Sequence, residues 1–323
     1  MKPVEQKYVD SDVPPGDPEV LRLLACLQSL VNGQSAIGEL AACGPKAVPP
    51  LREFLLEGRI ASVPHPRMWA VEALALLGAK DVLVEYLQAP SRVVDAQLQF
   101  AEDAVRNTAA RRLSAWRDNE TFEILLDLCG KRNLPGIIET LAVFERAEAI
   151  PCFDRALEDD LCRLAAEDGL RRLGPCARSA LLLSAVTPLP NAEDETPSSL
   201  CRRRSVLGLL TEIAVERRNW AKVRHLLAER DPELLAKLAL FASSIADPPD
   251  RVSAAVGLVA VLGRLPWFVW EAAEEALVAL APESVPAIDA ELIRRSSRPA
   301  HVRARDEVLR ALLRLRSTLR EFQ

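Results

Sequence analysis

The chain has 323 residues, a formal net charge of −5 at pH 7 and 49% hydrophobic residues. This composition excludes a disordered chain, a collagen and a small disulfide-rich scaffold. Its mildly acidic balance argues against attraction of the whole molecule to nucleic acid or to an anionic membrane. Leucine and alanine occupy 51 and 47 positions, and both favour helices. The composition therefore predicts an all-α protein.

The beginning of the chain predicts a flexible lead followed by a helix. Residues 1–16 are polar, contain three prolines and a glycine, and lack the apolar run of a secretion signal. Asp17 is a suitable cap for a helix that begins at Pro18, because proline is favoured in the first turn. Apolar residues then recur at helical spacing: Leu23, Leu24, Leu27, Leu30 and Val31.

A helix–turn–helix pattern recurs along the chain. It is clearest in residues 37–51 (IGELAACGPKAVPPL) and 167–181 (EDGLRRLGPCARSAL), and it is also present in 70–87 and 274–288. Glycine can end the first helix in the left-handed conformation, and proline suits the start of the next helix. Leucines at the equivalent position follow at intervals of 28 to 40 residues: Leu40, Leu74, Leu113, Leu141, Leu170 and Leu210. Such a period predicts stacked helix pairs.

At these residues the chain resembles HEAT repeats, of the type first associated with phycobilisome lyases. Arg106, Arg251 and Arg303 stand where HEAT repeats often carry an arginine. The resemblance spans most of residues 19–320 and implies a right-handed α-solenoid of stacked antiparallel helix pairs. Between residues 210 and 277 the pattern departs from its period, so repeat boundaries are not predicted there.

We expect four segments along the chain: a lead (1–16), an N-terminal array (17–186), a mobile loop (187–199) and a C-terminal array (200–323). The loop is predicted from its three prolines, its adjacent acids and its lack of apolar residues. Two interpretations remain open: the loop separates two arrays, or it is a long surface loop within one continuous array.

The sequence contains no recognisable catalytic, metal or cofactor motif. The three histidines are far apart, and none of the seven cysteines belongs to a C-x-x-C pair. We expect the cysteines to be reduced and mostly buried, in a cytoplasmic protein that spans no membrane. The sequence therefore predicts no catalytic residues, no metal ligands and no cofactor.

An aromatic cluster opens one of the predicted helices: Trp267, Phe268 and Trp270. The core stripe of this helix should consist of Val269, Ala273, Ala276, Leu277 and Leu280. Trp270 borders that stripe, whereas Trp267 and Phe268 lie on either side of the opposite face. The cluster is interpreted either as packing between helices or as a partner-binding patch. Two further tryptophans, Trp69 and Trp116, are predicted to be core residues.

Residues 291–323 carry nine arginines against four acids. The residues expected to face inward are Val308, Leu312, Leu315 and Leu319. Arg303, Arg310 and Arg314 would then form one outward stripe. The segment is interpreted either as a solvated capping helix or as a basic docking surface.

The leading functional hypothesis is a non-enzymatic scaffold, a monomer that presents a curved helical surface to a protein partner. One alternative is a DNA-binding or repair protein, because some HEAT-like proteins are DNA glycosylases; nucleic acid is nevertheless the less favoured partner. A possible set of residues for this DNA-binding or repair role is Arg106, Arg111, Arg112, Trp116 and Asp118. Another alternative is a lyase- or chaperone-like protein acting on a cofactor-bearing partner. A basic groove would favour DNA, a deep apolar pocket a cofactor, and a broad mixed surface a protein.

Overall fold

The described chain is all-α. The computed structural model describes residues 17–93, 95–188, 195–213 and 220–321, with the side chains of Phe268 and Glu321 left out. The predicted lead, residues 1–16, lies outside the described residues. The chain forms two compact units, which divide between Phe144 and Glu145. Each unit is described by itself below.

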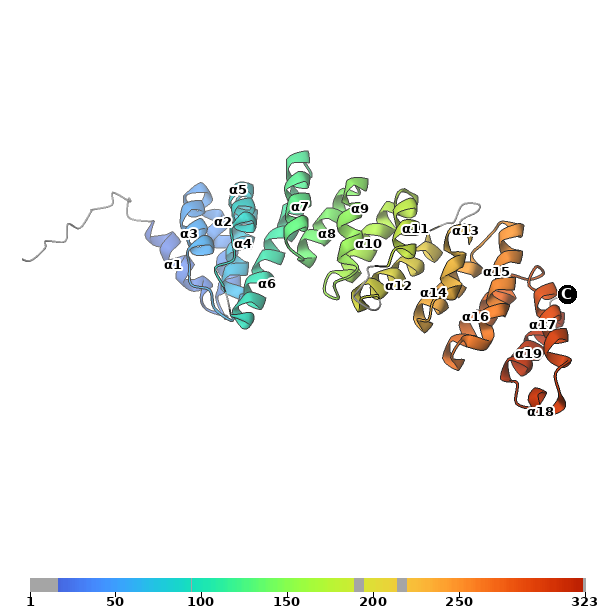
Figure 1. The fold of residues 1–323 in the computed structure, drawn as a ribbon. Coiled ribbons are helices and arrows are strands. Elements are labelled where there is room, and N and C mark those ends of the chain that lie inside the picture. Colours follow the sequence, from blue (N-terminus) through green and yellow to red (C-terminus); the bar gives the residue numbers. More distant parts are fainter. Residues whose placement is uncertain (1–16, 94, 189–194, 214–219, 322–323) are drawn as a thin grey trace, which may run out of the picture. The chain divides into compact units, whose positions relative to one another are not determined.

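Unit 1 consists of α-helices joined by short turns and two 3-10 helices (Figure 1). These elements are α1 (Pro18–Leu27), α2 (Gly33–Ala42), η1 (Gly44–Ala47), α3 (Val48–Leu56), α4 (His65–Leu76), α5 (Lys80–Gln88), α6 (Ala96–Arg112), η2 (Leu113–Ala115), α7 (Asn119–Lys131) and α8 (Pro135–Phe144). The even-numbered helices α2, α4, α6 and α8 pack on one another in order, and α3, α5 and α7 form a second layer. Helix pairs therefore stack sequentially, as the repeat pattern predicts.

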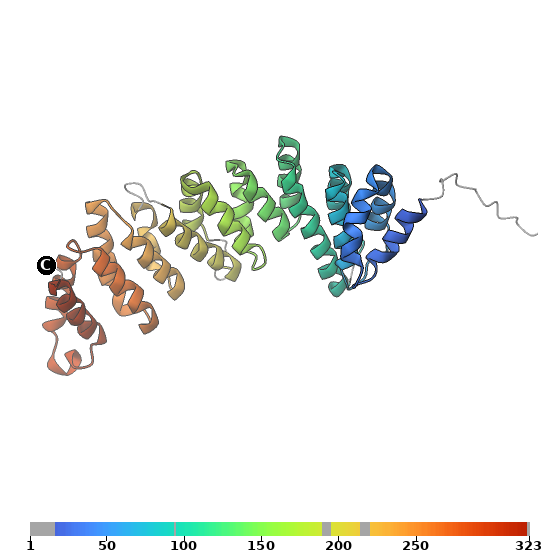
Figure 2. The ribbon, with the colours of Figure 1, turned by 180° about the vertical axis from the view of Figure 1, so that it is seen from behind.

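Unit 2 continues the same alternation (Figures 1 and 2). Its elements are η3 (Ala147–Ala149), α9 (Ile150–Ala156), α10 (Arg163–Leu173), η4 (Gly174–Ala177), α11 (Arg178–Val186), α12 (Pro197–Glu212), α13 (Trp220–Val223), η5 (Arg224–Ala228), α14 (Pro232–Ser243), α15 (Pro248–Val261), η6 (Leu262–Arg264), α16 (Trp267–Ala279), α17 (Val285–Ser296), α18 (Ala300–Arg303) and α19 (Glu307–Glu321). Helices α10, α12, α14 and α16 form one layer, and α9, α11, α13, α15 and α17 form the other. The last helix, α19, packs mainly on α17 and also contacts α16.

The predicted turns are confirmed in three copies of the pattern. Gly44, Gly78 and Gly174 have φ values of +71°, +72° and +53°, in the left-handed region that a residue with a Cβ rarely adopts. Pro45 and Pro175 then lie in short 3-10 helices that lead directly into α3 and α11. The leucines that mark the repeats are all buried: Leu40, Leu74, Leu113, Leu141, Leu170 and Leu210. The period read from the sequence is thus the period of the even-numbered layer.

The start of α1 is predicted correctly, but its end is not. Asp17 caps the helix by accepting a hydrogen bond from the backbone N–H of Glu19 at 2.9 Å, and Pro18 is its first residue. The helix ends at Leu27, so Leu30 and Val31 lie in the following turn and are exposed. The helical spacing read from the sequence therefore does not continue through these two residues.

The predicted loop over 187–199 is shorter at its C-terminal end. Residues 189–194 lie outside the described residues. Thr196 caps α12 by accepting from the backbone N–H of Ser199 at 3.2 Å, and the helix begins at Pro197. The Thr-Pro-Ser-Ser sequence is therefore a helix start rather than loop. Within residues 210–277, where the pattern departs from its period, Pro248–Val261 forms α15 in the odd-numbered layer of unit 2.

Candidate functional site

Helix α16 buries one face and leaves another face exposed. The five residues of its predicted core stripe are all buried: Val269, Ala273, Ala276, Leu277 and Leu280. Glu271, Glu274 and Glu275 alternate with them and therefore lie off the core face. The terminal helix α19 contacts α16 more lightly than it contacts α17.

An open groove of about 1050 Å³ lies between α16 and α19. Its walls combine aromatic, acidic and apolar side chains from α16 with residues from α19. The lining residues are Trp267, Trp270, Glu271, Glu274, Glu275, Val278, Ala279, Arg314, Leu315 and Thr318. The structure therefore brings together Trp267, Trp270 and Arg314, three of the residues singled out from the sequence.

The two tryptophans of the groove differ in burial. Trp267 exposes 78% of its surface, whereas Trp270 is half-buried and its indole Nε1 donates to the backbone oxygen of Leu265 at 2.9 Å. An aromatic side chain as exposed as Trp267 is unusual in a core-facing repeat helix. For this residue the packing interpretation was wrong. The side chain of Phe268 lies outside what the structure describes.

The groove is acidic. Its lining contains three glutamates and one arginine. Arg314 lies 3.8 Å from Glu274, whose pKa is raised because burial disfavours the charged carboxylate more than Arg314 favours it. Within the described residues, neither Glu271 nor Glu275 has an ion-pair partner. The groove thus holds more negative charge than it neutralises.

The arginines of the predicted outward stripe do not share one helix. Asp306 caps α19 by accepting from the backbone N–H of Leu309 at 3.0 Å, so Arg303 lies before the helix start, on the short α18. Arg310 is exposed on α19 and lies 3.9 Å from Glu307. Neither Arg303 nor Arg310 lines the groove. The inward prediction for α19 is confirmed, because its four apolar residues are buried: Val308, Leu312, Leu315 and Leu319.

Most charge in the C-terminal segment is paired within unit 2. Arg295 donates to Asp306 at 2.8 and 2.9 Å, and Arg298 donates to the same carboxylate at 3.2 Å. Arg316 pairs with Asp289 at 2.7 Å. These contacts tie α17, α19 and the turn between them together. They favour the capping role of the segment over that of a basic docking surface.

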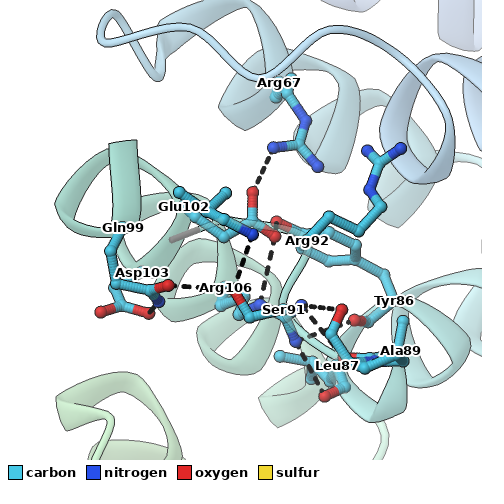
Figure 3. A network of polar contacts seen from close by, with 12 residues as sticks. Arg67, Tyr86, Leu87, Ala89, Ser91, Arg92, Gln99, Glu102, Asp103 and Arg106 are labelled. Carbon is cyan, nitrogen blue, oxygen red and sulfur yellow. Dashed lines mark hydrogen bonds and ion pairs between the residues drawn. The ribbon is translucent and has the colours of Figure 1, made fainter. Parts of the chain in front are cut away.

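Arg106, a residue of the HEAT resemblance and of the DNA-repair alternative, is buried in unit 1 (Figure 3). Its Nη1 atom donates to the backbone oxygens of Tyr86 and Leu87 at 3.2 and 3.1 Å, and its Nη2 atom donates to that of Ala89 at 3.0 Å. These carbonyls end α5, where a helix leaves acceptors unsatisfied. With 1% of its surface exposed, Arg106 is not available to a DNA phosphate.

Other arginines satisfy helix-end carbonyls in the same way. Arg67 donates to Leu55 at the end of α3 at 2.6 Å, and Arg203 donates to Ala185 near the end of α11 at 2.8 Å. Arg251 donates to Ala279, the last residue of α16, at 2.9 Å. A guanidinium has five donors in a rigid fork, which lysine lacks. The excess of 34 arginines over 7 lysines therefore has a structural use in this chain.

The remaining residues of the DNA-repair set are paired within unit 1. Arg111 pairs with Glu139, Arg112 pairs with Glu72, and Asp118 caps α7 by accepting from the backbone N–H of Thr121 at 2.8 Å. Asp118 also accepts from the Lys80 ammonium at 3.1 Å. Trp116 follows η2 and is half-buried, as is Trp69, whose ring packs against Gly33 of α2, so both are partly buried rather than fully enclosed.

A smaller cavity of about 370 Å³ lies in unit 1, at the start of α4. It combines apolar side chains with two arginines, and its lining residues are Gln28, Leu30, Phe54, Arg59, Ala61, Val63, Pro66 and Arg67. The sequence pattern singled out none of these as site residues. The volume lies at the lower end of the range of small-molecule pockets.

Three further features concern the cysteines, possible metal ligands and the length of the apolar helices. Cys129, Cys152 and Cys162 are buried as expected, but Cys176 is exposed. Within the described ranges, no cluster of three or more histidine, cysteine or acidic side chains is arranged to hold a metal ion. Among the helices of those same ranges, none is both long and apolar enough to cross a bilayer.

Comparison with known proteins gives distant likenesses to solved structures. No family model matches the chain, and no curated protein matches it. Among solved structures, that of human deoxyhypusine hydroxylase in complex with glycerol is similar over 84% of this chain and 96% of that chain, with 16% identity and a TM-score of 0.29. A likeness at this level carries no argument about function. The fold described above therefore rests on the helices of this chain.

Proposed function

We propose that this protein is a non-enzymatic protein-binding module, and that the groove between α16 and α19 holds its partner. The exposure of Trp267 at the rim of this groove is the observation that supports the proposal most directly. Tryptophan and arginine are the residue types that most often dominate the energy of protein interfaces. Trp267, Trp270 and Arg314 bring both types to one concave surface.

Two properties of the groove fit a protein partner. Its apolar lining from Trp270, Val278 and Leu315 offers a surface that a partner side chain could cover. Its walls are a helix of 13 residues and another of 15, so the surface is held by regular structure and not by a loop. A partner would therefore meet a preformed site, which lowers the entropic cost of binding.

The test compares proteins that co-purify with the full chain and with two single variants. Trp267→Ala removes the exposed indole. Leu313→Ala, on α19 but outside the groove lining, removes an apolar side chain of 54% exposure and serves as the matched control. We expect a partner that is retained by the wild type and by Leu313→Ala and lost with Trp267→Ala. Retention of the same partners by all three proteins would contradict the proposal.

A further inference from the structure

We propose that the groove recognises a positively charged, extended segment of a partner protein, with a lysine or arginine side chain lying against Trp267 and Trp270 and its cation meeting the glutamates of α16. This inference rests on the proposed function, which it narrows to one class of partner. It follows from the position of each tryptophan one turn before a glutamate along α16.

The tryptophans and glutamates of α16 form two adjoining stripes. Trp267, Glu271 and Glu275 follow one another at steps of four residues, and Glu274 lies four residues after Trp270. Residues at this spacing are neighbours on a helix surface. All five line the groove. Each indole therefore stands one turn before a carboxylate, an arrangement that can take the stem and cation of a basic side chain, because a cation is attracted both to the indole face and to the carboxylate.

The charges of the groove favour a cationic occupant. Three glutamates face one arginine, and that arginine is 69% exposed and 3.8 Å from Glu274. Glu271 and Glu275 have no ion-pair partner within the described part of the chain. A cationic segment would supply the missing charge, whereas the phosphates of a nucleic acid would be repelled.

The spacing of the carboxylates favours an extended segment. Glu271 and Glu275 are one turn apart, a separation of about 6 Å along the helix axis. In an extended peptide, alternate side chains lie on the same face about 6.6–6.8 Å apart. Basic residues at alternate positions of a partner would therefore match the two glutamates.

The experiment measures binding of a fluorescent nine-residue peptide with arginine at alternate positions, by anisotropy, to the full chain. A twin peptide carries citrulline in place of arginine, which keeps the shape and removes the charge. The protein variant Glu271→Gln/Glu275→Gln removes two exposed carboxylates of the groove. Its control, Glu53→Gln/Glu57→Gln, makes the same change of net charge on two exposed residues of unit 1, one in α3 and one directly after it.

We expect the arginine peptide to bind the wild type and the α3 control equally, and the groove variant about fivefold or more weakly, since each exposed ion pair contributes a factor of about 1.5 to 5. Trp267→Ala should weaken binding as well. Affinity should fall as salt is raised from 0.1 M to 1 M, because the screening length falls from about 10 Å to about 3 Å. The citrulline peptide should bind at least fivefold more weakly than its arginine twin.

Equal binding of both peptides, equal loss in both double variants, or tighter binding of a DNA duplex than of the arginine peptide would overturn the inference. Two further outcomes separate failure of this inference from failure of the broader proposal that the groove binds a protein. If Trp267→Ala still loses a co-purified partner, but the arginine peptide neither binds nor displaces it, only the cationic class is wrong. If Trp267→Ala loses no partner, the groove is not a protein-binding site.

Discussion

Arg106 and Glu102 lie one turn apart on α6, both are buried, and the Nε atom of Arg106 is 3.2 Å from Oε1 of Glu102. The same carboxylate accepts from the Tyr86 hydroxyl at 2.8 Å and pairs with Arg67 on α4 (Figure 3). Burial alone would raise the pKa of Glu102, but the charge and hydrogen bonds of Arg67, with help from Tyr86 and Arg106, hold it below its ordinary value. One buried carboxylate thus links three helices of unit 1.

Replacement of this carboxylate should destabilise unit 1 strongly. Glu102→Ala leaves two buried guanidinium groups without their shared partner, and breaking a buried pair in this way costs about 3–5 kcal/mol. Chemical denaturation followed by circular dichroism should show the loss, while Glu53→Ala on the exposed face of α3 should change stability by less than about 0.5 kcal/mol. A cost of Glu102→Ala below about 1 kcal/mol would show that the network contributes little.

Two glycines near the first repeat turn should respond oppositely to alanine. Gly44 has φ +71° and open space around its missing side chain, so Gly44→Ala should cost about 1–2 kcal/mol through backbone conformation alone. Gly38 lies within α2 with open space and an ordinary helical φ, so Gly38→Ala should stabilise by about 0.5–1 kcal/mol. Thermal unfolding of both variants measures these two changes in stability. The same sign of change in both would show that the turn geometry is not what distinguishes them.

The two tryptophans of unit 2 that differ most in burial should separate binding from stability. Trp267→Ala removes a side chain that is 78% exposed and should leave the free energy of unfolding within about 0.5 kcal/mol of the wild type. Trp220 is 1% exposed and its Nε1 donates to Ser253 at 3.2 Å, so Trp220→Ala should cost about 3–5 kcal/mol. Denaturation curves of the two variants provide the measurement, and a large cost of Trp267→Ala would place its indole in the core.

Glu274→Gln should stabilise unit 2 at neutral pH. The folded pKa of Glu274 lies above its ordinary value of 4.5 because burial disfavours the carboxylate, so its ionised form costs stability at pH 7. That cost is relieved as the pH falls through the folded pKa. The variant should therefore have a higher Tm at pH 7, by at most about 2 °C, and the same Tm as the wild type below pH 4.5.

The ion pair of Glu274 provides the control for this prediction. Arg314→Gln removes the counterion at 3.8 Å and should lower the Tm at pH 7 only when Glu274 is present. The effect should disappear when the two substitutions are combined. Thermal unfolding of the four proteins across pH measures the coupling. A lower Tm of Glu274→Gln at pH 7 would show that Arg314 more than compensates the burial of the carboxylate.

The sequence by itself determined the repeat architecture. A left-handed glycine, a following proline and an apolar stripe act within a few residues of one another, so the turns at Gly44 and Gly174 and the buried stripe of α16 follow from local pattern. Local pattern predicted the ends of helices less completely where a capping side chain sets the first residue of the helix. Asp306 starts α19 after Arg303, and Thr196 starts α12 within the predicted loop.

The tertiary structure decided which side chains remain available. Arg106 and Arg314 look alike in sequence, but one is buried against the end of α5 and the other faces a groove. The net charge of that groove depends on three glutamates of α16 and on Arg314, which lies forty residues after Glu274 on a helix that meets α16 only after stacking. Helical periodicity fixes which residues share a face. Which face is covered, and by what charge, depends on the neighbouring helices, and so it is decided only once the helices have packed.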